Sequence, residues 1–356
     1  MTKEPRETLV THAVLWSIAI GLAVSIAIVW GVGVNQVFDS FRHASWSVIA
    51  AYLTVSILIS VGLTVRWSVT LDAYGVRLPF YTLFIYRLIG FSVAYLTPSA
   101  HIGGEPTRAL LLKKQGIPLK VGFSSAVADK SLELLFNIVM FFLGSLVIAS
   151  ATGFPLLARI SIVFLAIVAL GLAALFTYNV FGGKRLLVPF LQLLRLHRLR
   201  SWPRVRQSAA DIEELISHFY TRKNRHFRHA VLINALLWVL MFLEYKFALL
   251  ILGYDASLFS ILVFLTGVGI AYAIPVPAAL GVLELGQLSA GVLLGVPPAI
   301  GVALAFVVRV RDILWTLVGA ALLAVFHLNA FNLYARSVAT AQKYNFERFS
   351  LELRGR

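Results

Sequence analysis

The sequence has 356 residues, no cysteine and few charged side chains. Without cysteine, the chain has no disulfide bonds, thiolate metal ligands or cysteine nucleophiles. Charged residues make up 13% of the chain, compared with roughly 25% in a soluble domain. The histidines have no HExxH spacing, and no GxSxG, P-loop or Rossmann motif opens a strand–helix unit. We therefore expect no metal site, no cofactor and no catalytic residue of a soluble enzyme.

Apolar residues dominate the composition. Hydrophobic residues account for 59% of the chain, and the mean hydropathy is +0.85. Apolar runs near the ~20 residues needed to cross a bilayer recur along the sequence, which predicts an all-α polytopic membrane protein. The first run is long for a signal peptide and has no evident cleavage site, so we expect it to be retained. About eight full spans are predicted, at 13–34, 47–71, 80–97, 119–150, 156–182, 228–252, 257–275 and 298–326.

Basic residues outnumber acidic ones by 31 to 16, and their location is informative. They cluster in an insert at about 183–228 and in a tail at about 327–356. Loops rich in Lys and Arg face the cytoplasm. The insert, the tail and both termini are therefore predicted to be cytoplasmic, in a protein of the cytoplasmic (inner) cell membrane. Because the charge follows the loops, it does not indicate a nucleic-acid partner.

The basic insert has two parts. Residues 184–200 alternate leucine and arginine, a pattern typical of a helix that lies among lipid headgroups and favours anionic lipids. Residues 206–225 predict a short soluble helix. Alternatively, the insert is only an orientation signal and a linker.

A pattern of prolines, glycines and charges occurs twice, 179 residues apart. It predicts repeat A at about 47–150 and repeat B at about 228–326, with interrupted segments at 98–117 and 277–296. Interrupted hydrophobic segments at matching positions of two halves indicate a transporter's binding site. The matched residues are Pro98, Glu105, Gly116, Pro118, Gly122, Lys130 and Glu133 in repeat A, and Pro277, Glu284, Gly295, Pro297, Gly301, Arg309 and Asp312 in repeat B.

The loop charges also bear on orientation. They agree with one another only if each interrupted segment crosses the membrane once, which makes the two repeats inverted. If both segments are instead re-entrant hairpins, the basic termini fall outside.

The first interrupted segment combines glycines with charge. Glu105 and Arg108 follow a Gly-Gly pair. A helix N-terminus beside an arginine suits an anionic headgroup. Alternatively, the pair only neutralises a kink. Hinge freedom and close approach are expected at Pro98, Gly103, Gly104, Pro277 and Gly281.

Two further groups of charges share a spacing. Asp129, Lys130 and Glu133 lie on one side of a helix, and Arg309 and Asp312 repeat the three-residue interval. Ionisable residues inside a membrane mark a pathway or a paired network. The structural alternative is two crossed ion pairs, Lys130 with Asp312 and Arg309 with Glu133.

Glu284 has no basic neighbour in sequence. If it is buried and unpaired, it can carry a proton; a salt bridge between helices explains it equally well. Glu244 and Lys246 are two residues apart and cannot face each other on a helix, so each needs another partner.

Three arginines are weaker candidates. Arg66 and Arg159 lie near span ends, and we expect them to snorkel toward the interface. Arg87 lies deeper, upstream of the first break, and is a lower-ranked site residue.

The strings PSAHIGGEPTRALLLKKQGIP, ADKSLE, PVPAALGVLELG and RVRDILW, within about 10–330, resemble a flippase-like family. Its best-known member is the membrane region of lysylphosphatidylglycerol synthase. By that resemblance, Glu105 and Arg108 match one motif, Asp129 and Lys130 the next, and Glu284 a proline–glycine–glutamate motif. The chain shows no synthetase or glycosyltransferase domain, so the resemblance implies translocation rather than synthesis.

Together these observations predict translocation of an anionic lipid, or of a polyprenyl-phosphate-linked lipid, between leaflets. The alternatives are a membrane-embedded headgroup transferase and a membrane partner subunit of a separate synthase. The expected partners are the lipid substrate and anionic lipids at the insert. A homodimer is left open.

Overall fold

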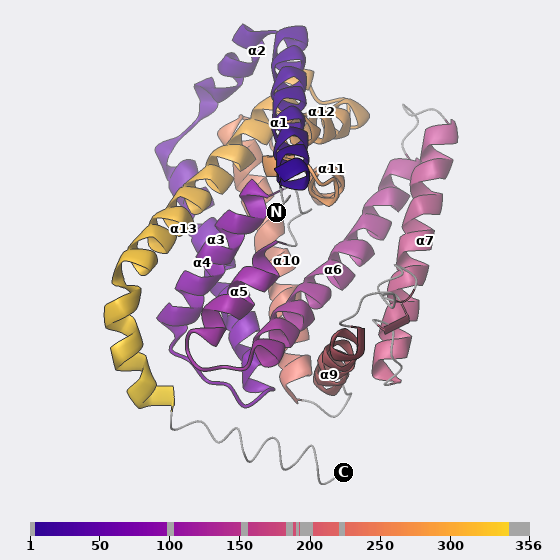
Figure 1. Cartoon of the computed structure of the whole chain (residues 1–356). Coiled ribbons are helices and arrows are strands. Elements are labelled where there is room, and N and C mark those ends of the chain that lie inside the picture. The colour runs from indigo at the N-terminus through magenta and orange to yellow at the C-terminus, as the bar shows by residue number, and fades with distance from the viewer. Residues whose placement is uncertain are drawn as a thin grey trace.

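The computed structural model describes residues 4–97, 103–150, 156–182, 188–189, 192, 202–220 and 225–341. All regular structure in these ranges is helical, which confirms the predicted all-α class (Figure 1). Pro98 and most of the segment 183–201 lie outside the described residues.

The N-terminal region precedes the two repeats. It consists of α1 (Glu4–Val32), α2 (Val34–Asp39) and the short η1 (Ser40–His43). The chain bends by 83° between α1 and the segment that begins with α2. Gly33 lies at this bend with φ of 103°, a conformation that residues with a Cβ rarely adopt.

The rest of the chain forms two similar series of helices. They are separated by the apolar helix α7, which pairs with α6 to form a hairpin arm, and by the amphipathic helix α9. The first series is α3 (Trp46–Asp72), α4 (Phe80–Leu96), α5 (Gly104–Lys113) and α6 (Leu119–Ser150). The second is α10 (Arg225–Ile251), α11 (Leu258–Ala273), η3 (Pro277–Ala279), α12 (Val282–Leu293) and α13 (Pro298–Ala341). Between them lie α7 (Leu156–Phe181) and α9 (Trp202–Tyr220).

Among the residues that the structure describes, four helices are long and apolar enough to cross a membrane: α3, α6, α7 and α10. The bent α1–α2 pair is a fifth candidate. By contrast, α4 and α11 have 17 and 16 residues, or about 24–26 Å, less than the ~30 Å hydrocarbon core. Length and composition therefore support a multi-pass protein without establishing eight full spans.

The turns of the two series match in detail. Gly116 and Gly295, 179 residues apart, both have positive φ, at 80° and 67°. Each turn closes with the same backbone hydrogen bonds: Ile117 N donates to Leu112 O, and Val296 N donates to Gly291 O. The repeated sequence pattern thus corresponds to a repeated local fold.

The first helices of the two series pack against each other in opposite directions. On α3, Arg66 hydrogen-bonds to Asn234 of α10, whereas Ser56, earlier on α3, bonds to Glu244, later on α10. The later residue of α3 thus contacts the earlier residue of α10, and the earlier residue of α3 contacts the later one. The two helices are therefore antiparallel.

The series also exchange contacts. Helix α4 packs on α13, and α11 packs on α6. A glycine allows each approach: a Cβ at Gly319 would lie 2.2 Å from Leu88 O, and one at Gly144 would lie 1.9 Å from Thr266 Oγ1. Matching helices of two antiparallel series meeting in this crossed way is the arrangement expected for inverted repeats. The exact repeat boundaries stay a prediction.

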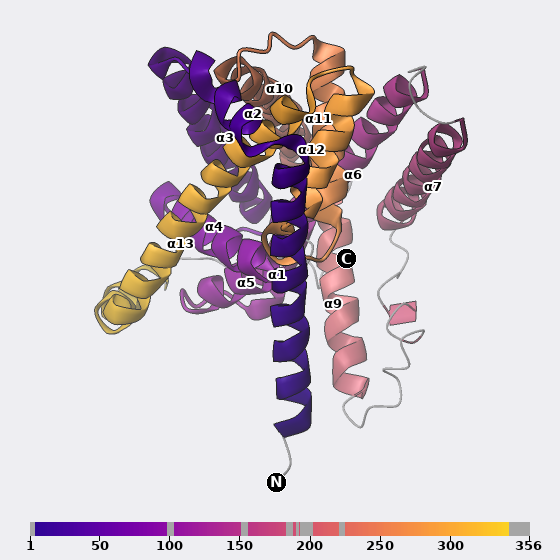
Figure 2. The ribbon, with the colours of Figure 1, turned by 90° about the horizontal axis from the view of Figure 1, so that it is seen from above.

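The arm and the amphipathic helix lie at the edge of the fold. Only 11% of the apolar span of α7 is buried in the protein, and it lies beside α6 (Figure 2). Helix α9 covers part of the helix expected at 206–225. It docks on the bundle through buried Phe219 and Tyr220, and Tyr220 Oη lies 2.6 Å from Ser131 Oγ of α6.

Candidate functional site

The first break positions two charges by letting helices α4 and α5 cross closely. A Cβ at Gly104 would lie 2.7 Å from Gly90 O, so glycine is needed for the contact. Glu105 and Arg108, on the first turns of α5, are both buried. Gly104 lies at a close contact between the two helix backbones, whereas Gly103 is the N-cap of α5 with an ordinary φ of −67°.

Asp129 is the centre of the charges from repeat A. Its Oδ1 lies 2.7 Å from Arg66 Nε. Its Oδ2 accepts from Arg108 at 3.0 Å and from Arg87 at 3.4 Å. One carboxylate of α6 therefore joins arginines from α3, α4 and α5.

Glu133 extends this network along α6. It pairs with Lys130 at 2.6 Å and with Arg66 Nη2 at 3.1 Å. The remaining nitrogen of the Arg66 group donates to Asn234 of α10. We call the set the first cluster: Arg66, Arg87, Glu105, Arg108, Asp129, Lys130, Glu133 and Asn234.

The first cluster is buried at its centre and partly exposed at Arg87, Lys130 and Glu133. The side chains of Arg66 and Asp129 are each 1% exposed. Those of Arg87 and Lys130 are each 16% exposed, and Glu133 is comparable. Arg108 is held beneath them by Glu105 at 3.3 Å and by the ring of Trp67, 4.8 Å from its guanidinium. Arg87 and Lys130 are therefore the most exposed cations of the cluster.

The second break carries backbone strain. Ala278 and Ala279 have φ of 53° and 47°, in the left-handed region that costs non-glycine residues about 1–3 kcal/mol. Arg309 Nη1 donates to Ala278 O at 2.9 Å. The same guanidinium bonds Glu284 Oε1 at 2.9 and 2.6 Å. An arginine of α13 thereby holds a strained turn of the break in place.

Arg311, two residues on, serves a second pair of acids. It donates to Asp312 at 3.0 and 2.8 Å and to Glu244 of α10 at 2.5 Å. Asp312 also accepts from the hydroxyl of Tyr272 on α11. We call this set the second cluster: Glu244, Tyr272, Glu284, Arg309, Arg311 and Asp312.

The two clusters differ in formal charge and lie at different depths. The first combines four cations with three carboxylates, and the second two cations with three carboxylates. Along α3 they are separated by the ten residues from Ser56 to Arg66, and along α10 by the ten from Asn234 to Glu244, or about 15 Å. The excess charge is positive in the first cluster and negative in the second.

Helix α1 covers the second break. A Cβ at Gly21 would lie 2.7 Å from Leu280 Cβ, and one at Gly281 would lie 2.9 Å from Gly21 O. Gly281, with φ of 76°, donates its N–H to Ser25 Oγ at 2.9 Å and to Glu284 Oε2 at 3.0 Å. Close approach at Gly281 is thus present, and buried Pro277 begins η3 beside it.

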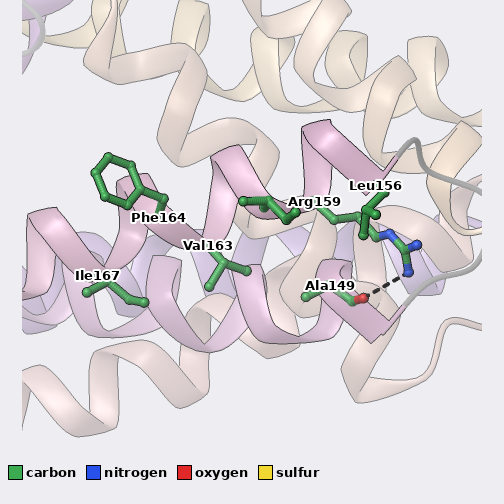
Figure 3. Close-up of a pocket in the computed structure, with 7 residues that line it drawn as sticks. Ala149, Leu156, Arg159, Val163, Phe164 and Ile167 are labelled. Carbon is green, nitrogen blue, oxygen red and sulfur yellow. Dashed lines mark hydrogen bonds between the residues drawn. The ribbon is translucent and has the colours of Figure 1, made fainter.

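A separate pocket of about 350 Å³ lies between α6 and α7 (Figure 3), and none of its lining residues belongs to either cluster. Its lining is apolar except for Arg159, which donates to Ala149 O at 3.3 Å. Arg159 stands in the first turn of α7, the span-end position predicted for it. In the described part of the chain, no three His, Cys, Asp or Glu side chains are grouped to hold a metal ion.

Comparison with known proteins places this architecture in a family. The model of the lysylphosphatidylglycerol synthase TM region matches residues 14–326, most of the chain. The chain belongs to the lysylphosphatidylglycerol synthase TM-region family. The match includes both breaks and both clusters.

Curated relatives of this family member are archaeal membrane proteins. A UPF0104 membrane protein of Methanothermobacter thermautotrophicus is 26% identical over 301 residues, covering 82% of this chain and 89% of the relative. One of Pyrococcus horikoshii is 24% identical over 309 residues, covering 82% and 90%. No solved structure matches. The names of these relatives describe membrane proteins and state no substrate.

Most candidate residues predicted from the sequence meet in this family member, but the predicted crossed pairing is wrong. Lys130 pairs with Glu133, not Asp312, and Arg309 pairs with Glu284, not Glu133. Each cluster is closed mainly by partners from its own repeat, because the breaks bring α5 onto α6 and α12 onto α13.

Two other expectations are corrected. Arg66 does not snorkel: it is fully buried, because its partners lie on α6 and α10. Glu284 is buried but not unpaired, so the salt-bridge alternative holds for it and the condition for carrying a proton is not met. Glu244 and Lys246 do take different partners, Arg311 and Asp255.

Sequence reasoning missed several members of the clusters. No sequence motif singled out Asn234 or Tyr272, because uncharged polar residues are ordinary in a membrane span. Arg311 was passed over because it stands between the two predicted residues Arg309 and Asp312. A buried cation needs more than one acceptor. An inventory of unmatched intramembrane charges would have linked Glu244 to Arg311.

Proposed function

We propose that the protein translocates a lipid with an anionic, phosphate-bearing headgroup between the leaflets of the cytoplasmic membrane. The observation that carries the proposal is the excess positive charge of the first cluster, next to a broken helix. Arg87 and Lys130 are its most exposed cations. Charged side chains at such depth are costly in a membrane and usually mark a substrate pathway.

The chemistry of Arg87 favours a phosphate. A guanidinium has five N–H donors, and Arg87 makes one long contact to Asp129 at 3.4 Å. It can therefore donate to a phosphate oxygen without breaking the central pairs of Arg66 and Arg108. Lys130 adds a second, mobile ammonium. Acyl or isoprenoid tails would stay in the surrounding lipid, to which α7 and the outer faces of α3 and α10 present exposed apolar side chains.

The second break supplies the moving part of this proposal. Its backbone has left-handed φ angles at Ala278 and Ala279. Arg309 bonds the carbonyl of Ala278, and α1 packs over the break through Ser25. Strain of this kind is common where a segment changes conformation. In the proposed orientation, the basic insert and both termini face the cytoplasm, and the first cluster is nearer that side than the second.

The test uses the purified full-length protein in vesicles of phosphatidylglycerol and phosphatidylcholine with trace acyl-labelled fluorescent phosphatidylglycerol. Dithionite added outside bleaches only the outer leaflet, so protein-dependent loss of the inner pool reports translocation. Arg87→Gln and Lys130→Gln should each slow it about tenfold or more, because a hydrogen bond to a charged group contributes about 1.5–3 kcal/mol.

Lys246→Gln is the matched control, because Lys246 pairs with Asp255 outside both clusters, and its rate should equal that of the wild type. A labelled polyprenyl phosphate in place of phosphatidylglycerol distinguishes the two lipid classes. Vesicles with protein that bleach no faster than empty ones would overturn the proposal. Chemical modification of the labelled headgroup without leaflet exchange would favour the transferase instead.

A further inference from the structure

The second cluster has one carboxylate more than it has cations. Glu284 is matched by the two hydrogen bonds from Arg309. Arg311 alone serves both Asp312 and Glu244. All three acids are almost fully buried. A net negative charge at this depth is costly unless a further positive charge accompanies it.

Two buried hydroxyls border the same acids. Tyr52 of α3 and Tyr245 of α10 are 4% and 3% exposed. Neither hydroxyl oxygen has a hydrogen-bond partner among the described residues. Both lie within electrostatic range of Arg311, Glu244 and Asp312. A phenol can donate to a carboxylate or accept from a carboxylic acid, so these hydroxyls are chemically suited to either protonation state of a nearby acid.

We propose that the second cluster binds one exchangeable proton, on the carboxyl of Glu244, and that this proton controls lipid translocation. The inference rests on the proposed function for its second half only. Asp312 receives two hydrogen bonds from Arg311 and one from Tyr272, whereas Glu244 receives one from Arg311 and one from Ser56. Donors that bind a carboxylate favour its charged form, so Glu244 is the acid that gains the proton.

The charge balance closes with one proton. The proton comes from water and forms an O–H bond on Glu244, with no change in electrons. Two carboxylates are then balanced by two guanidinium groups: Glu284 pairs with Arg309, and Asp312 pairs with Arg311. The charged and titratable groups that interact with Glu244 are Arg311 and Asp312 of α13, Tyr52 of α3 and Tyr245 of α10. Tyr95 of α4 and Tyr272 of α11 interact with Asp312, and Glu284 of α12 pairs with Arg309.

A metal cation is a poorer occupant than a proton. Hard cations need about six or more oxygen ligands, and the described residues offer no group of three acids or histidines around one point. In addition, the Arg311 guanidinium lies between the two acids and would repel a cation. Proton uptake needs only one oxygen.

The direct test is an infrared titration of the full-length protein in phosphatidylglycerol vesicles. Wild-type protein should show the C=O band of a buried carboxylic acid that appears and disappears with pH, and Glu244→Gln should lose it. Asp255→Asn is the control, since Asp255 is an exposed loop acid, and it should keep the band. A titrating band that persists in Glu244→Gln, or its absence from the wild type, overturns the proton site.

The coupling is tested with the fluorescent-lipid assay. Wild-type translocation should accelerate on acidification by up to about tenfold per pH unit, the limit for one proton. Glu244→Gln should flatten this profile while still moving lipid, and Glu244→Asp should restore it. Lipid movement that depends on Na⁺ instead of pH, or an identical profile in Glu244→Gln, overturns the coupling. No lipid movement in any variant overturns the proposed function and leaves the infrared result to decide the proton site.

Discussion

Arg66 shows how one side chain can join three helices inside an apolar protein. It projects from α3 and bonds Asp129 and Glu133 of α6 and Asn234 of α10. Its planar fork of donors suits this geometry, which an ammonium cannot reproduce. Because the group is fully buried, removing it leaves Asp129 Oδ1 and Glu133 Oε2 without the donors that pair with them.

Arg66→Leu should lower the free energy of unfolding by about 3–5 kcal/mol, the usual cost of breaking a buried ion pair by removing one partner. Arg66→Lys should fall between it and the wild type. The measurement is chemical or thermal unfolding in a mild detergent. Arg42→Gln is the control, since Arg42 is 76% exposed in its pair with Asp39 and such pairs contribute about 0–1 kcal/mol. Equal losses in Arg66→Leu and Arg42→Gln would contradict the bridging role.

At this scale the sequence predicts short-range pairs better than long-range ones. The three-residue spacing of Lys130 and Glu133 correctly put them on one helix face, where they form an ion pair. Arg66 was misread because its partners lie 63, 67 and 168 residues away. Its distance from the end of α3 suggested the interface, and only the packing of α6 and α10 makes its position buried.

The helix pair α4–α5 depends on contact between backbones. Gly90 and Gly104 meet with no side chain between them. A Cβ on Gly90 would lie 2.9 Å from Arg108 Cγ. Small residues let membrane helices approach closely, which is a main source of their association. The crossing therefore aims both Arg108 and Glu105 at α6.

Gly104→Ala should destabilise the protein by about 1–3 kcal/mol, because the new methyl group would overlap Gly90 O and force the helices apart. The same change at Gly171 of α7 is the control. A Cβ there meets nothing within 4 Å, and alanine improves a helix interior by up to about 1 kcal/mol. Unfolding of the two variants under identical detergent conditions checks the difference. A Gly104→Ala variant as stable as Gly171→Ala would refute the need for backbone contact.

The apolar runs predict the positions of the long helices well, but they predict the breaks and bends between helices less well. The long helices α3, α6, α7 and α10 lie close to their predicted ranges. The bend at Gly33 was not predicted, because a single glycine in an apolar run is also compatible with a straight helix. The left-handed backbone of Ala278 and Ala279 had no sequence signal, since alanine ordinarily avoids that region.

On the scale of the whole molecule, the two series of helices are interlocked. The contacts of α4 with α13 and of α11 with α6 tie each series to the other, and Ser92 Oγ donates to Thr316 O at 2.8 Å within the first of these interfaces. The repeat at offset 179 predicted two similar units. It did not predict the interlock, which depends on the helix faces that the glycines at 144 and 319 leave open.

The antiparallel course of α3 and α10 leads to a topological prediction. Pro118 and Pro297 hold equivalent places, 179 residues apart, and both are exposed just before α6 and α13. If the repeats are inverted in the membrane, a cysteine at 118 faces the cytoplasm and one at 297 faces outside. The natural chain has no cysteine, so single variants carry no background. In intact cells a membrane-impermeant maleimide should label Pro297→Cys and should reach Pro118→Cys only after the membrane is opened. Labelling of both from the same side would mean that the repeats are parallel, or that a break turns back instead of crossing.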